Sequence, residues 1–233
     1  MLNATSHIPS CTIGLDLGDR TSCVYAIDAA GQETDARAIP TTLAGLARYF
    51  GSRAPCRVVL EVGTHSPWVS RALTALGHEG IVANPSAMYG KRRRRKRNDP
   101  LDAEFLARQG RADVRLLYPI QHRRALAQEH LEILRARDQL VQVRTQLINH
   151  VRGTVKAQGG RVPTCAAEAF VPRATAALPA PLTAAVTPLL QTLTEVTRTI
   201  HAYDTQIATL TRDHYPVALR LQQPAGVGPL TAL

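Results

Sequence analysis

Residues 12–17 read TIGLDL, and Gly18 and Asp19 follow directly. A short apolar run that is closed by a glycine and an acid is typical of a buried β-strand ending in a turn. The next segments continue this pattern, with β-branched and aromatic residues over 21–27 and a further candidate strand over 32–39. We therefore predict that the fold opens with three consecutive strands.

Helices and strands alternate after these three strands. Helical spacing of apolar residues is found over 42–50 and 67–76, and short apolar runs at 57–62 and 80–83 predict two more strands. A further helix is expected to begin at Asp99, with Pro100 in its first turn and Gly110 near its end. The order β-β-β-α-β-α-β-α predicts an α/β domain.

The second half of the chain has a different pattern. Residues 121–157 are almost free of glycine and proline and carry apolar side chains close to heptad spacing. A similar stretch covers 182–212, and a link rich in helix breakers, 159–181, separates the two. We predict two long helices. They could form an antiparallel hairpin or a dimerising coiled coil, or a helical subdomain packed on the α/β part.

The chain has a formal net charge of +10, and most of the excess lies in one segment. Such a balance favours a polyanionic partner, with nucleic acid first and an anionic membrane surface second. Because the segment lies between two ordered-looking regions, we expect a loop that binds phosphate rather than a solvated tail. Its seven consecutive cations are Lys91, Arg92, Arg93, Arg94, Arg95, Lys96 and Arg97.

Several protein classes are disfavoured. No apolar run reaches the roughly 18 residues that span a bilayer, and the N-terminus lacks the zones of a signal peptide, so we expect a cytoplasmic protein. The cysteines at 11, 23, 56 and 165 form no CxxC pair, and we expect four reduced, mostly buried thiols. HExxH, Walker A and GxSxG motifs are absent from the sequence.

Four carboxylates occupy positions that suit a metal-binding site. Asp16 and Glu61 lie at predicted strand ends, where a buried acid costs several kcal/mol unless it is paired or metal-bound. Asp99 and Asp102 share one face of a predicted helix start, although each alone also suits an N-cap or a dipole partner. Gathered at one sheet edge, the four could hold Mg²⁺, and two ions would support in-line attack on a phosphodiester.

The segments GLDLGDRTSCVYAID, VVLEVGTHSPW and RNDPLDAEFLAR, with PAGVGPLTAL more weakly, resemble the DEDD-type transposases of the insertion sequence 110 family. The resemblance implies an RNA-guided recombinase with an RNase-H-like, Holliday-junction-resolvase-like domain. It further implies a coiled-coil segment that forms a homo-oligomer, a C-terminal transposase domain bearing a serine nucleophile, and DNA and guide RNA as partners. Asp16, Glu61, Asp99 and Asp102 are then the catalytic tetrad that binds Mg²⁺. The corresponding domains are 1–118, 119–214 and 215–233.

Two features depart from that pattern. Arg97 stands where the family usually has lysine, and the expected serine lies beyond Leu233, so we interpret the chain as C-terminally truncated. We do not assign the role of the missing serine nucleophile to Ser66. Ser66 and His65 are more simply explained as residues at the start of a helix. Three alternatives remain: an inactive nucleic-acid-binding fragment, a free-standing Mg²⁺-dependent nuclease or junction resolvase, and a sugar-kinase-like ATPase whose further motifs we do not find.

Overall fold

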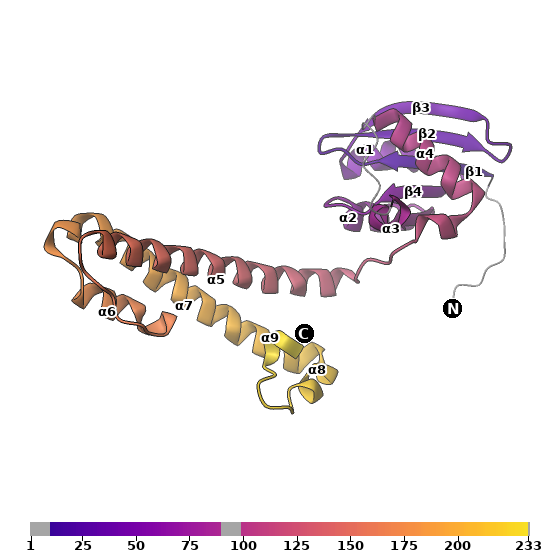
Figure 1. Cartoon of the computed structure of the whole chain (residues 1–233). Coiled ribbons are helices and arrows are strands. Elements are labelled where there is room, and N and C mark those ends of the chain that lie inside the picture. Colours follow the sequence, from indigo (N-terminus) through magenta and orange to yellow (C-terminus); the bar gives the residue numbers. More distant parts are fainter. Residues whose placement is uncertain (1–9, 90–98, 233) are drawn as a thin grey trace. The chain divides into compact units, whose positions relative to one another are not determined.

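The computed structural model describes residues 10–89 and 99–232. Within it the chain folds as two units, Met1–Arg123 and Arg124–Leu233. The first contains a β-sheet with helices, and the second consists of helices (Figure 1). The domain boundaries predicted at 118/119 and 214/215 stay predictions.

The first unit is built on a five-stranded sheet in the order β3-β2-β1-β4-β5. The pairs β1–β2 and β2–β3 are antiparallel, whereas β1–β4 and β4–β5 are parallel. Thus β1 is the central strand, and the three predicted opening strands are confirmed as one antiparallel meander. The strands are β1 (Cys11–Asp16), β2 (Thr21–Asp28), β3 (Glu33–Pro40), β4 (Arg57–Glu61) and β5 (Glu79–Ala83).

The predicted helices of this unit are also confirmed. They are α1 (Leu43–Phe50), α2 (Ser66–Ala75) and α4 (Asp99–Ala112). The Thr42 side chain caps α1 by accepting a hydrogen bond of 3.0 Å from the Gly45 amide. Two shorter pieces that sequence patterns did not indicate, α3 (Pro85–Tyr89) and the 3₁₀ turn η1 (Val114–Leu117), follow β5 and α4.

Helices cover both faces of the sheet (Figure 1). On one face, buried side chains of α1 and α2, such as Phe50 and Leu73, pack on Ile13 and Leu60 of the sheet. On the other face α4 packs on β1, β2 and β4, and Ala107 lies among buried residues of β2. The unit therefore has three layers, with the sheet in the middle.

Two glycines allow α4 to approach the sheet closely. A Cβ on Gly14 would overlap the carbonyl oxygen of Ala103 and come within 2.7 Å of the Ala107 nitrogen. Gly110 faces β4, where a Cβ would overlap a methyl of Val59. Gly110 lies near the end of α4, as predicted, two residues before Ala112, and this glycine also serves close helix–sheet packing.

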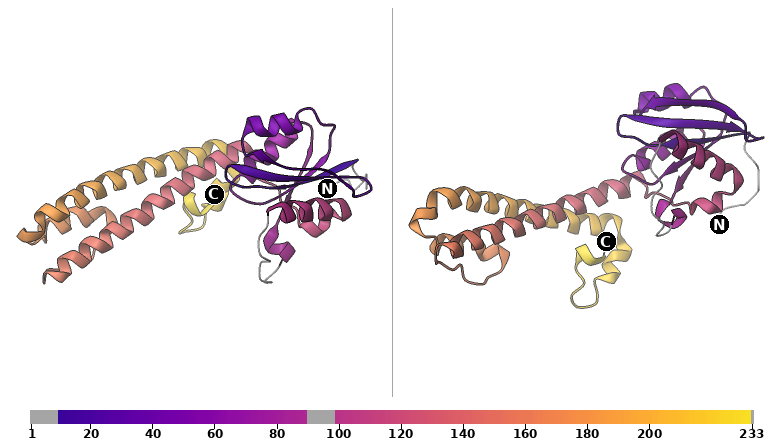
Figure 2. Two further views of the ribbon diagram at one scale, coloured as in Figure 1. Left: turned by 90° about the horizontal axis from the view of Figure 1, so that it is seen from above. Right: turned by 45° about the horizontal axis from the view of Figure 1, so that its top comes forward.

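The second unit contains the two predicted long helices, α5 (Ala125–Ala157) and α7 (Thr183–His214). They lie side by side and antiparallel (Figure 2). His130 near the start of α5 accordingly contacts Tyr215 at 2.9 Å, just after α7 ends. Arg137 forms an ion pair of 2.9 Å with Asp204. The pair is therefore a helical hairpin.

Shorter helices complete this unit. The breaker-rich link contains α6 (Phe170–Ala176), and Pro172 is tolerated there because it lies in the first turn. Phe170 is buried against the far end of the hairpin, with Val155 and Val186. The remaining elements are η2 (Ala167–Ala169), η3 (Ala180–Leu182), α8 (Pro216–Leu221) and α9 (Pro229–Ala232).

Two further observations bear on the sequence analysis. None of the four cysteines forms a disulfide, but only Cys56 is buried, so the expectation of mostly buried thiols is wrong for the other three. Within the described ranges no single helix is long and apolar enough to cross a bilayer. One pair, Ala167–Ala176 and Ala180–His214, reaches that length and composition only when both parts are taken together across a bend of 118°.

Candidate functional site at the carboxyl edge of the sheet

Asp16 and Glu61 are the last residues of the neighbouring parallel strands β1 and β4. The register pairs Leu15 with Leu60, and both of these leucines pack in the α1/α2 core. Successive side chains of a strand point to opposite faces. The two carboxylates, one residue further along, are therefore neighbours at the carboxyl edge of the sheet on the face that α4 covers. Both are half-buried.

Helix α4 brings its first turn to the same edge. Ala103 lies over Gly14, whereas Gly110 lies over Val59 and Thr12, nearer the start of the strands. The helix thus runs antiparallel to β1, and its N-terminal end lies toward Asp16. Asp102 directly precedes Ala103 and is half-buried, and the helix begins at Asp99. Asp16, Glu61 and Asp102, which come from three separate segments, therefore lie toward one edge of the sheet.

The structure does not assemble these acids into a finished metal site. Over residues 10–89 and 99–232, no three His, Cys, Asp or Glu side chains are grouped closely enough to hold an ion. The donor chemistry nevertheless fits Mg²⁺, since carboxylate oxygens on one side of the sheet are the ligands that hard cations prefer. The seven cations of 91–97, predicted to hold phosphate, fall outside the described residues.

A pocket of about 330 Å³ opens in the loops that follow β1 and β4. His65 contributes to its wall with Asp19, and the His65 Nε2 lies 3.6 Å from a carboxylate oxygen of Asp19. The Trp68 indole N–H donates to His65 Nδ1 at 3.1 Å, so the proton of the neutral imidazole is on Nε2, toward Asp19. The pocket wall therefore carries an imidazole and a carboxylate next to the strand ends that bear Asp16 and Glu61.

The loop before α2 supports the predicted helix entry. The Ser66 hydroxyl donates to the Gly63 carbonyl at 2.8 Å and accepts from the Gly63 amide at 3.0 Å. With its proton used there, the hydroxyl accepts from His122 Nε2 at 2.9 Å. Ser66 is fully buried. Its hydroxyl holds the loop together and is not exposed to a substrate.

His122 has a lowered pKa. Burial lowers it first, and the positive charge of Arg71 adds to the effect. The imidazole is therefore neutral at physiological pH, which suits a hydrogen-bonding role beside Ser66. Sequence patterns gave no sign of this contact, because the two residues are 56 positions apart.

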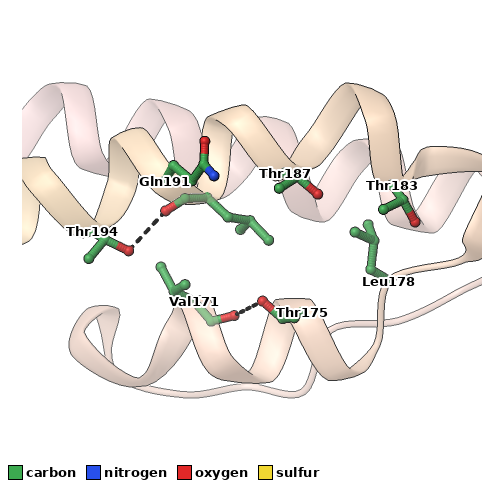
Figure 3. Close-up of a pocket in the computed structure, with 8 residues that line it drawn as sticks. Val171, Thr175, Leu178, Thr183, Thr187, Gln191 and Thr194 are labelled. Atoms are coloured by element: carbon green, nitrogen blue, oxygen red, sulfur yellow. Dashed lines mark hydrogen bonds between the residues drawn. The ribbon is translucent and has the colours of Figure 1, made fainter.

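A second pocket, of about 290 Å³, lies between α6 and α7 in the helical unit (Figure 3). Its lining is uncharged and rich in threonine. Thr175 and Thr194 donate to carbonyl oxygens of their own helices, at 2.9 Å and 3.1 Å. These hydroxyls are therefore already engaged, and the pocket offers no group for acid, base or metal chemistry.

Comparison with known proteins gives two matches. The model of the transposase family of DEDD type from insertion sequence IS110 matches residues 13–158, which include Asp16, Glu61, Asp99 and Asp102. A curated protein of Pseudomonas aeruginosa, named "Probable family 20 transposase", is 27% identical over 231 residues. That alignment covers 94% of the chain and 65% of the relative's length. The chain thus spans just under two thirds of the relative that it matches.

Proposed function

Because this chain belongs to the IS110 family of DEDD transposases, we propose that its first unit carries out metal-dependent cleavage and transfer of DNA strands. The strand order β3-β2-β1-β4-β5, with an antiparallel meander followed by parallel strands, supports an RNase-H-like fold. Such a fold would present acids at the carboxyl edge of its central strands to a nucleic-acid backbone.

One observation carries this proposal. Asp16 and Glu61 end adjacent parallel strands on the face covered by α4, and α4 brings Asp102 toward the same edge. Two neighbouring carboxylates repel each other when both are charged, and a cation bound between them would relieve that repulsion.

We assign Mg²⁺ binding to Asp16, Glu61, Asp99 and Asp102. Bound Mg²⁺ would supply charge neutralisation at the phosphodiester and a more acidic nucleophile. The residues themselves would orient the ion-binding oxygens and fix the position of the cleaved strand. The pocket beside His65 would receive the nucleotide next to the reacting phosphate.

The segment 91–97 is proposed to hold the phosphate backbone. It supplies seven of the chain's positive charges, and it directly precedes the helix that carries Asp99 and Asp102. Contacts of this kind release counterions, so binding should weaken steeply as salt rises. We propose that the same segment binds guide RNA, because an RNA backbone carries the same negative charge. Separately, we propose that the α5/α7 hairpin mediates formation of a homo-oligomer.

The decisive experiment measures cleavage of labelled duplex and four-way DNA with Mg²⁺. Asp16→Asn and Glu61→Gln should each reduce cleavage by at least about a hundredfold, as expected when one transition-state contact is lost. Glu79→Gln is the matched control, because this acid opens β5 at the opposite edge of the sheet and its partner is Arg57. It should stay within about twofold of wild type.

Metal binding provides a readout that does not need turnover. Mn²⁺ binding, followed by electron paramagnetic resonance, should weaken in Asp16→Asn and stay unchanged in Glu79→Gln. If the wild-type chain binds DNA and Mn²⁺ but cleaves nothing, the alternative of nucleic-acid binding without catalysis is favoured. Equal cleavage by the site and control variants would refute the proposed site.

A further inference from the structure

Two cysteines lie side by side at the end of the sheet opposite to the carboxylates. Cys11 begins β1, and Cys56 immediately precedes β4. The parallel register pairs Thr12 with Arg57, so the cysteines are neighbours across the two strands. Adjacent strands lie about 4.8 Å apart, and disulfides span Cα separations of roughly 4.4–6.8 Å. The backbone spacing therefore suits a bond between them.

The side chains also share a face. Cys56 belongs to the α1/α2 core, and Cys11 packs against the same cluster. The two thiols are close enough for each to shift the pKa of the other. Cys56 is buried, whereas Cys11 is half-buried and so presents its sulfur nearer to solvent. The pair consequently has one accessible and one protected sulfur.

A buried histidine supplies a base for the protected sulfur. His78 Nε2 lies 3.1 Å from the Phe50 carbonyl oxygen, which can only accept, so Nε2 carries the ring proton. Nδ1 is then unprotonated, and it accepts from the Cys56 amide at 3.3 Å. The same Nδ1 lies 3.2 Å from the Cys56 sulfur, where it can take the thiol proton.

We propose that Cys11 and Cys56 form a reversible dithiol–disulfide site whose oxidising substrates are low-molecular-weight disulfides. The Cys11 thiolate attacks one sulfur of the small disulfide, forms a mixed disulfide and releases one small thiolate. Cys56 then loses its proton to His78 Nδ1 and attacks the Cys11 sulfur. The mixed disulfide breaks, a second small thiol leaves, and the proton returns to it. Two protein thiols are oxidised, and one small disulfide is reduced to two thiols.

The electrostatic environment supports this order of events. The neighbouring Cys56 thiol and the positive charge of Arg53 lower the pKa of Cys11, burial and the negative charge of Asp28 oppose them, and the net pKa is about 7. The neighbouring Cys11 thiol and burial raise the pKa of Cys56. Since the thiolate is the nucleophile, Cys11 should react first. This site is independent of the proposed transposase chemistry.

The test uses the full chain with Cys23→Ser and Cys165→Ser, which leaves this pair as its cysteines. After treatment with glutathione disulfide, free thiols should fall from two to none without formation of disulfide-linked dimers. Trypsin without reductant should yield peptide 1–20 joined to peptide 54–57, and dithiothreitol should separate them. Two thiols that persist, a stable mixed disulfide with glutathione, or disulfide-linked dimers would each overturn the proposal.

Two variants in the same background assign the roles. With Cys11→Ser, reaction of the remaining thiol with glutathione disulfide should slow by at least about tenfold, because Cys56 is buried. His78→Asn should slow the release of the second glutathione while leaving the first unchanged. Circular dichroism checks that this variant is folded. Unchanged kinetics in Cys11→Ser would refute the assignment of Cys11 as the first nucleophile.

Discussion

Replacement of Gly14 by alanine should loosen α4 from the sheet. The added Cβ would overlap the Ala103 carbonyl oxygen and lie 2.7 Å from the Ala107 nitrogen. Both contacts are with helix backbone, so rotation of a side chain cannot relieve them. To restore ordinary contact distances the helix must retreat by about 1.5 Å in a tightly packed interior.

The cost follows from what that retreat opens. Ala103 and Ala107 are completely buried against β2, and their contacts would be lost along with those of Leu106 against Val59. Overpacking of this kind costs about 1–3 kcal/mol, and a backbone clash belongs at the upper end. Alanine recovers part of this through the lower chain entropy of the unfolded state, about 0.5–1 kcal/mol. We expect a net loss of about 2 kcal/mol.

Trp68 offers a specific assay. It is the only tryptophan of the chain and lies in α2, so its fluorescence during urea unfolding reports on the first unit. Gly63→Ala is the matched control, since a Cβ there meets nothing within 4 Å, and it should change the free energy of unfolding by less than about 0.5 kcal/mol. If Gly14→Ala unfolds like this control, the close approach of α4 to β1 is refuted.

Two further predictions concern other regions. Gly153→Ala should stabilise the helical unit by about 0.5–1 kcal/mol, measured by thermal melting of its circular dichroism, because this glycine lies inside α5 with open space around it; a lower melting temperature would contradict this. Burial raises the pKa of Asp35, but hydrogen bonds from Arg37 and Tyr49 outweigh it and leave the pKa lowered. The contribution of the charged Asp35 carboxylate to the free energy of unfolding is therefore complete above about pH 4 and is lost as the pH falls through the lowered pKa. Asp35→Asn should cost about 1–2 kcal/mol at pH 7 and progressively less as the pH falls below about 4, whereas a cost that does not change with pH would refute the role of charge.

The order of elements could be read from the sequence because each has a local signal. Apolar runs end at turn residues, and Gly153 and Pro188 are the single breakers within the two long helices. The positions of Asp16 and Glu61 at strand ends were also predictable. That the two acids are neighbours was not predictable, because the parallel pairing of β1 with β4 depends on packing between segments 45 residues apart.

Features formed by distant residues escaped the sequence patterns. The direction of α4 depends on close approach at Gly14, and a glycine in a strand gives no hint of which helix will cover it. The contact between Trp68 and His65 and the one between Ser66 and His122 arise only once α2 is in place. Likewise, the cysteine spacing gave no reason to pair Cys11 with Cys56.

The central position of β1 has a consequence for biosynthesis. This strand leaves the ribosome before the other strands of the sheet. Its face toward α4 stays uncovered until that helix, which ends at Ala112, has also emerged. Until then the nascent sheet exposes the apolar surface formed by Tyr25, Ile27 and Val59. We therefore expect ribosome-bound chains halted before this helix to be held by chaperones and to be sensitive to protease. Chains arrested only after Ala112 has emerged from the ribosome should no longer be held by chaperones and should resist protease.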